Sequence, residues 1–138
     1  MRWLLTAACV AALGVCAPGC GSDGRKPVFP VSGKVTWAGK PARGATVVFH
    51  PVGDNGPDAV RPRGKVKDDG TLEVTTYAAK DGAPAGEYRV TVEWWLSPGG
   101  DAAPTNRLPS KLGQPDSSGL TVSVAQGPTT IRDIELKR

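Results

Sequence analysis

The chain has no cysteine beyond position 20, and its three cysteines are Cys9, Cys16 and Cys20. A disulfide framework, a zinc site built on thiolates and a cysteine nucleophile are therefore excluded for everything that follows. Histidine is nearly absent too, since His50 is the only one. Zinc hydrolysis needs at least three good protein ligands, which a single histidine without thiols does not provide. We expect no metal and no cofactor.

Long apolar runs are also missing. The longest extends from Trp3 to Val15, which is shorter than the roughly 20 residues that a membrane-spanning helix needs. It follows the positive charge of Arg2 and leads through Ala17-Pro18-Gly19 to Cys20. A charged start, an apolar stretch and small residues form the pattern of a cleaved secretory signal. The sequence thus predicts a signal peptide over residues 1–19 and an exported protein.

A signal that ends in a cysteine resembles a bacterial lipoprotein signal. In that family the chain is cut before the cysteine, which then carries fatty chains; stable anchoring takes more than one chain. The resemblance implies that Cys20 is lipidated and holds the protein at a membrane, facing the periplasm or the cell surface. Cys16 is an alternative, with Leu13 in the favoured place but bulky Val15 at the cut. An ordinary secretory signal cut near the same point is another.

Helical periodicity is absent after the signal, and alternation of apolar and polar residues takes its place. The clearest example is Glu87–Trp94, where Tyr88, Val90, Val92 and Trp94 share one face. Further strands are expected over 31–37, 45–50, 64–67, 71–76, 120–124 and 134–136. About seven short strands with frequent turns predict an all-β fold, a single antiparallel β-sandwich with Greek-key connections.

The domain organisation follows from composition. Residues 20–29 are polar and glycine-rich at their start and are expected to form a flexible tether. Residues 30–138 are enough for one domain with its own core. The formal net charge of +4 suits solubility and weak attraction to anionic surfaces. Basic residues do not recur beside stacking aromatics, so no nucleic-acid partner is expected.

Three stretches resemble the carboxypeptidase regulatory-like domains, which are also described as transthyretin-like or prealbumin-like sandwiches. The first runs from Val31 to Phe49, the second is the hairpin from Gly64 to Leu72, and in the third a Pro/Gly turn delivers Tyr88 into the next strand. The segments 108–112 and 118–122 further resemble small lipoproteins of planctomycete-type bacteria. The resemblance implies a transthyretin-like or immunoglobulin-like sandwich, and in metallocarboxypeptidases this domain accompanies a separate catalytic one. A urate-related hydrolase of similar fold depends on histidine-rich motifs that this chain lacks.

Few residues qualify as a functional site. His50 precedes Pro51 at a strand end and is interpreted as a surface or capping residue. The acidic turn Asp68-Asp69-Gly70 lacks the ligand spacing of a calcium loop and is interpreted as a turn. Adjacent strand residues face opposite ways, so we expect Trp94 in the core and Trp95 outside. Trp95 then either contacts a ligand or is covered by the expected loop 96–119.

Taken together, these patterns predict a non-catalytic, lipid-anchored module for binding, adhesion or scaffolding at the cell envelope. Its expected partners are the membrane, through the lipid on Cys20, and an envelope protein or polysaccharide. The alternative function is a carbohydrate or peptidoglycan-fragment binder that uses Trp95 and the loop 96–119, because an exposed indole can stack on a sugar.

Overall fold

The computed structural model describes residues 24–137, so the expected signal peptide and both Cys16 and Cys20 lie outside the described residues. The described chain is all β, with one short 3-10 turn, η1 (Ser110–Gly113), and no α-helix between residues 24 and 137. Its strands are β1 (Val28–Phe29), β2 (Val31–Trp37), β3 (Lys40–Pro41), β4 (Thr46–Pro51), β5 (Arg63–Val66), β6 (Thr71–Thr75), β7 (Ala83–Pro84), β8 (Gly86–Glu93), β9 (Trp95–Leu96), β10 (Thr105–Asn106), β11 (Leu120–Val124), β12 (Thr129–Thr130) and β13 (Ile134–Leu136).

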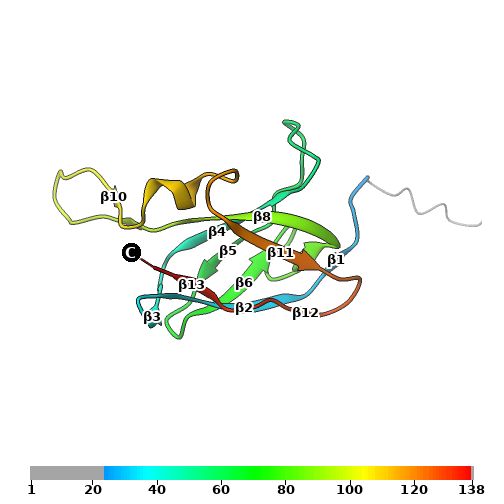
Figure 1. The fold of residues 1–138 in the computed structure, drawn as a ribbon, viewed down its shortest axis with the longest axis horizontal. Coiled ribbons are helices and arrows are strands. Elements are labelled where there is room, and N and C mark those ends of the chain that lie inside the picture. Colours follow the sequence, from blue (N-terminus) through cyan, green and yellow to red (C-terminus); the bar gives the residue numbers. More distant parts are fainter. Residues whose placement is uncertain (1–23, 138) are drawn as a thin grey trace, which may run out of the picture.

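One sheet holds most of the fold and curls into a sandwich. Its strands follow the order β11-β8-β4-β5-β6-β2-β12, and β3 and β13 also pair with β2. In Figure 1 β8 and β11 lie in the upper layer, β2 and β12 lie in the lower one, and β5 and β6 run between β4 and β2. The order β4-β5-β6-β2 is a Greek key in which the strand that precedes three hairpin-linked strands lies beside the last of them. The expected all-β sandwich is therefore confirmed.

Two pairings differ from the antiparallel rule. β12 and β13 both run parallel to β2, with Thr129 opposite Val31 and Ile134 opposite Val35. After β11 the chain crosses from the upper layer to the lower one instead of turning back in a hairpin, and this crossing sets the parallel direction. β13 begins only at Ile134, after the buried Ile131.

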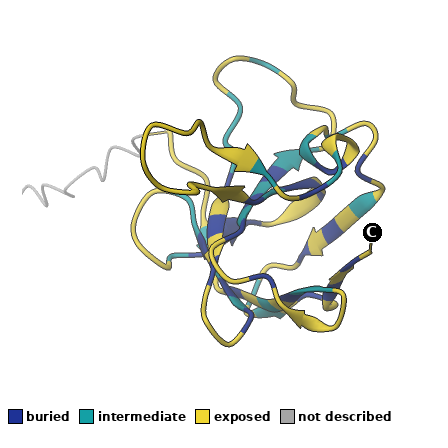
Figure 2. Ribbon diagram, turned by 90° about the vertical axis from the view of Figure 1, so that its left-hand side faces the viewer, coloured by how far each residue is buried: buried dark blue, intermediate teal, exposed yellow. Residues whose placement is uncertain are grey.

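The core lies between the two layers. It is built from the inward positions of alternating strands, and Val47, Phe49, Val90 and Val92 are fully buried. Figure 2 shows buried and exposed residues alternating along the strands, as expected when one face of each is covered. Among residues 24–137 the core residues fall between Val31 and Leu136 and pack on each other. The domain from Gly24 onward therefore has a core of its own.

Tyr88 fixes the entry to the longest strand. Its ring is buried, lies edge-on to Phe49 with ring centroids 5.8 Å apart, and its hydroxyl donates a 2.7 Å hydrogen bond to the carbonyl of Pro84. The bond ties the start of β8 to β7, which pairs with β1. The fold thus begins at Val28, inside the last residues of the expected tether.

Candidate functional site

The two adjacent tryptophans at the end of β8 face opposite ways, as the strand phase predicts. Trp94 is 8% exposed and belongs to the core, whereas Trp95 is 54% exposed. The backbone N–H of Trp94 donates to the side-chain oxygen of Asn106 at 3.0 Å, and the same oxygen accepts from the N–H of Leu108 at 3.1 Å. Asn106 therefore fixes the chain on both sides of the tryptophan pair.

The expected loop 96–119 contains regular secondary structure. Trp95–Leu96 pairs with Thr105–Asn106 as the hairpin β9–β10, which projects from one end of the sandwich in Figure 1. Residues 107–118 then fold back over β8, where η1 packs and where Leu108, Leu112 and Thr91 are buried. The returning chain covers this part of the sheet and leaves Trp95 open, so the expectation that the loop covers Trp95 is not met.

The indole of Trp95 is held at one edge. Its Nε1–H donates to a carboxylate oxygen of Glu93 at 3.1 Å, because both side chains lie on the same face of the strand. Leu96 beside it is 39% exposed. The hairpin therefore presents an oriented aromatic ring on one face and an exposed leucine on the other. An exposed aromatic face can contact a sugar ring or an apolar protein surface.

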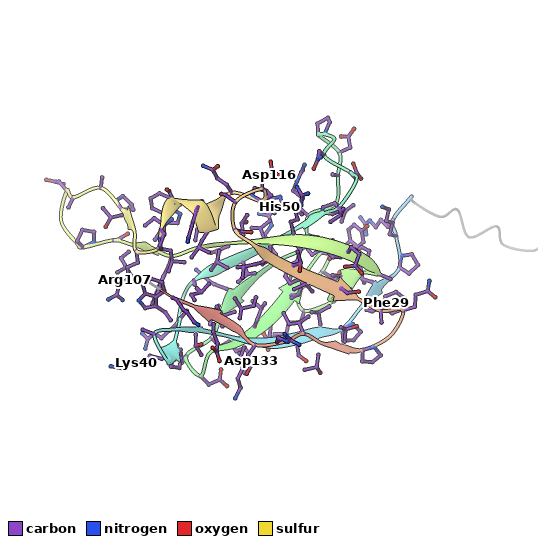
Figure 3. The ribbon with its side chains drawn as sticks, viewed as in Figure 1. Phe29, Lys40, His50, Arg107, Asp116 and Asp133 are labelled. Atoms are coloured by element: carbon purple, nitrogen blue, oxygen red, sulfur yellow. The ribbon has the colours of Figure 1, made fainter. Side chains whose placement is uncertain are left out.

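A second feature lies at the same end of the sandwich. A hollow of about 490 Å³ is lined by Trp37, Ala38, Lys40, Pro41, Trp94 and Arg107. The guanidinium of Arg107 lies 4.9 Å from the ring centroid of Trp94, within cation–π range. Figure 3 shows Lys40 and Arg107 at this end, on strand β3 and next to β10. The hollow carries two cations and no carboxylate among its lining residues, so it favours a ligand with negative charge.

A larger hollow, about 680 Å³, follows the seam where the curled sheet does not close, between β11 and the strands β12 and β13. Side chains of both signs stand along it, Arg132, Asp133, Glu135 and Lys137, and Figure 3 marks Asp133 there. Mixed charges on short edge strands are the usual protection against pairing with another chain. We therefore assign the seam a protective role and no ligand.

His50 has a structural partner. Its Nε2 lies 3.0 Å from the hydroxyl of Thr91, on the outer face shared by β4 and β8, and Thr91 is buried. Burial, together with the nearby charge of Arg61, lowers the pKa of His50. The residue thus joins two neighbouring strands in its neutral form. The sequence predicted a surface or capping residue, whereas the structure shows a half-buried side chain that links β4 to β8.

Acidification is expected to destabilise the domain through His50. Because its pKa in the folded state lies below the usual 6.5, the unfolded chain binds a proton more readily. The contribution of neutral His50 to the free energy of unfolding is fully present above pH 6.5 and is lost as the pH falls toward the pKa of the folded state. His50→Gln cannot titrate and should lose less stability in that window. Urea unfolding of both proteins at about pH 7.5 and pH 5.5 measures the difference, and equal losses would contradict the assignment.

The acidic turn Asp68-Asp69-Gly70 behaves as a turn. Asp69 accepts hydrogen bonds from the backbone N–H and the hydroxyl of Thr71, which lower the pKa of its carboxyl, and Asp68 pairs with Arg43 at 3.2 Å. Within residues 24–137 no three His, Cys, Asp or Glu side chains gather closely enough to hold a metal ion. The same stretch contains no helix long and apolar enough to cross a membrane.

Sequence reasoning identified Trp95 but missed Asn106, Arg107 and Lys40. The signal that could have pointed to Asn106 is the polar Thr105-Asn106 pair before Leu108, where a side chain can accept backbone N–H groups. Lys40 and Arg107 are far apart in the chain, and only the fold brings them to one end. Comparison of the chain with protein-family models, with curated proteins and with solved structures found no match.

Proposed function

We propose that the protein is a non-catalytic binding module of the cell envelope, held at the membrane by a lipid on Cys20 and facing the periplasm or the cell surface. The order of strands, the β5–β6 hairpin and the Tyr88–Pro84 bond support the resemblance to carboxypeptidase regulatory-like domains. On that resemblance the domain is a binding domain. We place its binding surface at the hairpin β9–β10.

A single observation carries this proposal, namely the exposure of Trp95. An indole that is 54% exposed, yet held by Glu93, offers its face at little entropic cost, because its orientation is already set. Aromatic faces stack on sugar rings. The hollow with Lys40 and Arg107 lies at the same end, and its positive charge suits the carboxylates of an acidic cell-wall saccharide. A cell-wall polysaccharide or its fragment is therefore the favoured ligand.

Leu96 supports a second candidate partner. Leu96 and Trp95 are both exposed, on opposite faces of β9, and exposed aromatic residues of this kind anchor protein interfaces. An envelope protein docked on the hairpin would also agree with the adhesion or scaffold role. Chemical cross-linking from a residue placed at position 96 would then capture one defined protein, whereas a saccharide ligand would give none.

Loss of the Trp95 ring is expected to weaken polysaccharide binding by about tenfold. A stacked aromatic contributes about 0.5–1.5 kcal/mol in addition to its buried area, and about 1.4 kcal/mol corresponds to a factor of ten. Trp95→Phe retains a ring and should retain part of the affinity. Tyr77→Ala is the matched control, because Tyr77 is an exposed aromatic outside the hairpin. Sedimentation with purified cell-wall polysaccharide measures the binding. Unchanged binding by Trp95→Ala would remove the saccharide proposal.

The anchor is tested separately at the mature N-terminus. Mass spectrometry of the protein extracted from membranes should show a chain that begins at Cys20 and carries fatty acyl chains. A lipidated Cys16 would move the anchor to that residue. An unmodified N-terminus downstream of position 20 would overturn the anchoring proposal and leave the binding surface unaffected.

A further inference from the structure

The outer side of β5 and β6 collects cations from separate parts of the chain. Residues directly opposite each other in a ladder have side chains on the same face of the sheet, and Lys65 stands opposite Glu73, which stands opposite Ser32. Lys34 is opposite Thr71, and Arg63 is opposite Thr75. The intervening positions point into the core. We call the cations on this side the basic face: Lys34, Arg63, Lys65, Lys67 and Lys80.

One carboxylate lies among these cations. Glu73 pairs with Lys67 and, at 3.2 Å, with Lys80, and these partners lower the pKa of its carboxyl. No carboxylate of the described chain pairs with Lys34, Arg63 or Lys65, all of which are exposed. Around the margin, Asp68 pairs with Arg43, and Asp81 accepts backbone N–H groups of residues 76–78. Backbone hydrogen bonds leave the charge of Asp81 in place, and Glu135, opposite Thr36, and Glu93, opposite Thr46, stand on the same side of neighbouring strands. Five cations surround Glu73 at the centre of the basic face, so positive charge is in excess there, and these carboxylates reduce it at the margin.

The basic face continues toward the point where the chain enters the domain. The turn after β6 carries Tyr77, whose hydroxyl accepts a 3.2 Å hydrogen bond from the backbone N–H of Lys26. The guanidinium of Arg25 lies 5.4 Å from the ring centroid of Tyr77. Lys80 follows in the same turn. The chain that leads toward Cys20 therefore passes Tyr77, in the turn that carries Lys80. At full extension Lys26 lies within about 20 Å of Cys20 along the chain.

We propose that the basic face lies against anionic phospholipid headgroups and is a second attachment of the domain to the membrane. The inference rests on the membrane location proposed above. Two arguments select a lipid surface as the occupant. The excess charge is complementary to an anionic leaflet, and the chain that leads to the lipidated residue starts at the margin of the same face. A lipid chain and a basic patch together hold a protein more firmly than either one alone.

The test uses the domain Gly24–Arg138, which contains the whole core and no lipidation site. It is sedimented with vesicles of phosphatidylcholine alone or of equal parts phosphatidylcholine and phosphatidylglycerol. We expect binding to the anionic vesicles only, with an affinity that falls as salt is added. Each basic residue near an anionic surface contributes about a fivefold gain in affinity. The variant Lys34→Gln/Arg63→Gln/Lys65→Gln should therefore bind about a hundredfold more weakly.

A matched control distinguishes the effect of the basic face on vesicle binding from the effect of the total net charge. The variant Lys111→Gln/Arg132→Gln/Lys137→Gln changes the net charge equally at exposed positions outside the basic face, and should bind like wild type. Both triple variants should keep the wild-type urea midpoint, because none of these cations is paired with a carboxylate within the described chain. Equal weakening by the two variants, or no preference for anionic vesicles, would overturn the proposal. Binding to immobilised dextran sulfate without binding to anionic vesicles would overturn it in favour of an anionic polymer.

These outcomes are independent of the polysaccharide and lipidation tests. The vesicle assay contains neither cell-wall saccharide nor Cys20, so failure of the Trp95 experiment leaves its result intact. Conversely, if the domain does not bind anionic vesicles, the full chain can still be lipidated at Cys20 and the hairpin can still bind cell-wall polysaccharide.

Discussion

Gly82→Ala is expected to lower the free energy of unfolding by about 3 kcal/mol or more. Gly82 has a φ of +95°, a conformation that an alanine adopts only with strain. A Cβ built there would lie 1.8 Å from the carbonyl oxygen of Phe29 and 2.9 Å from the Cα of Pro30. Backbone atoms cannot give way as a flexible side chain would. Strand β1 must therefore move away from β7, and urea unfolding measures the cost.

Gly127→Ala is the matched control for that change. A Cβ at position 127 meets nothing within 4 Å, so the substitution should stay within about 0.5 kcal/mol of wild type. Hydrogen exchange then shows where the damage lies. In Gly82→Ala the amides of β1 and β7 should exchange rapidly while those of β2 and β8 stay protected. Unchanged stability and protection would contradict the close approach of Gly82 to Phe29.

Phe49→Ala is the second change with a large expected effect, about 3–5 kcal/mol. Phe49 is among the largest fully buried side chains and lies edge-on to Tyr88, so truncation leaves a cavity between the layers and removes a ring contact. Since a domain of this kind has only about 5–15 kcal/mol in total, the variant should be close to unfolding. The urea midpoint reports the loss.

Phe49→Leu controls for general disturbance of β4. It retains most of the apolar volume, and it should cost about 1.5 kcal/mol or less. A loss equal to that of Phe49→Ala would mean that ring geometry, and not filled volume, dominates at this position. Little loss in either variant would contradict the burial of Phe49 at the centre of the sandwich.

The strands were predictable because each has one buried and one exposed face. The alternation in 87–94 is enough to separate Trp94 from Trp95, and Gly70 marks the β5–β6 turn through its need for a positive φ. The sequence placed Tyr88 in the strand after a Pro/Gly turn, and the bond from its hydroxyl to the carbonyl of Pro84 ties the strand to that turn. Each of these features depends on a few consecutive residues, whose local conformational preferences agree with the structure that they adopt.

The features that escaped prediction depend on pairs of distant residues. The hairpin β9–β10 joins Trp95 to Asn106 across a polar stretch without alternation. The parallel direction of β12 and β13 follows from a crossing between layers, which has no local signature. Lys34 and Lys65 share a face because Glu73 stands opposite both Ser32 and Lys65 in neighbouring ladders. From composition alone these cations are only part of a weak and scattered positive charge.

The small ribbon of β1 and β7 has a mechanical consequence if the protein is anchored through Cys20 as proposed. A pull from that side would first load the contacts of Arg25 and Lys26 with Tyr77 and then β1, which two residue pairs hold to β7. Once they separate, residues 24–30 add about 20 Å of slack before the force arrives at β2. That strand is bonded to β6 along one edge and to β12 and β13 along the other. Separation of β1 from β7 would therefore lengthen the N-terminal segment under load before the strands of the sandwich begin to unfold.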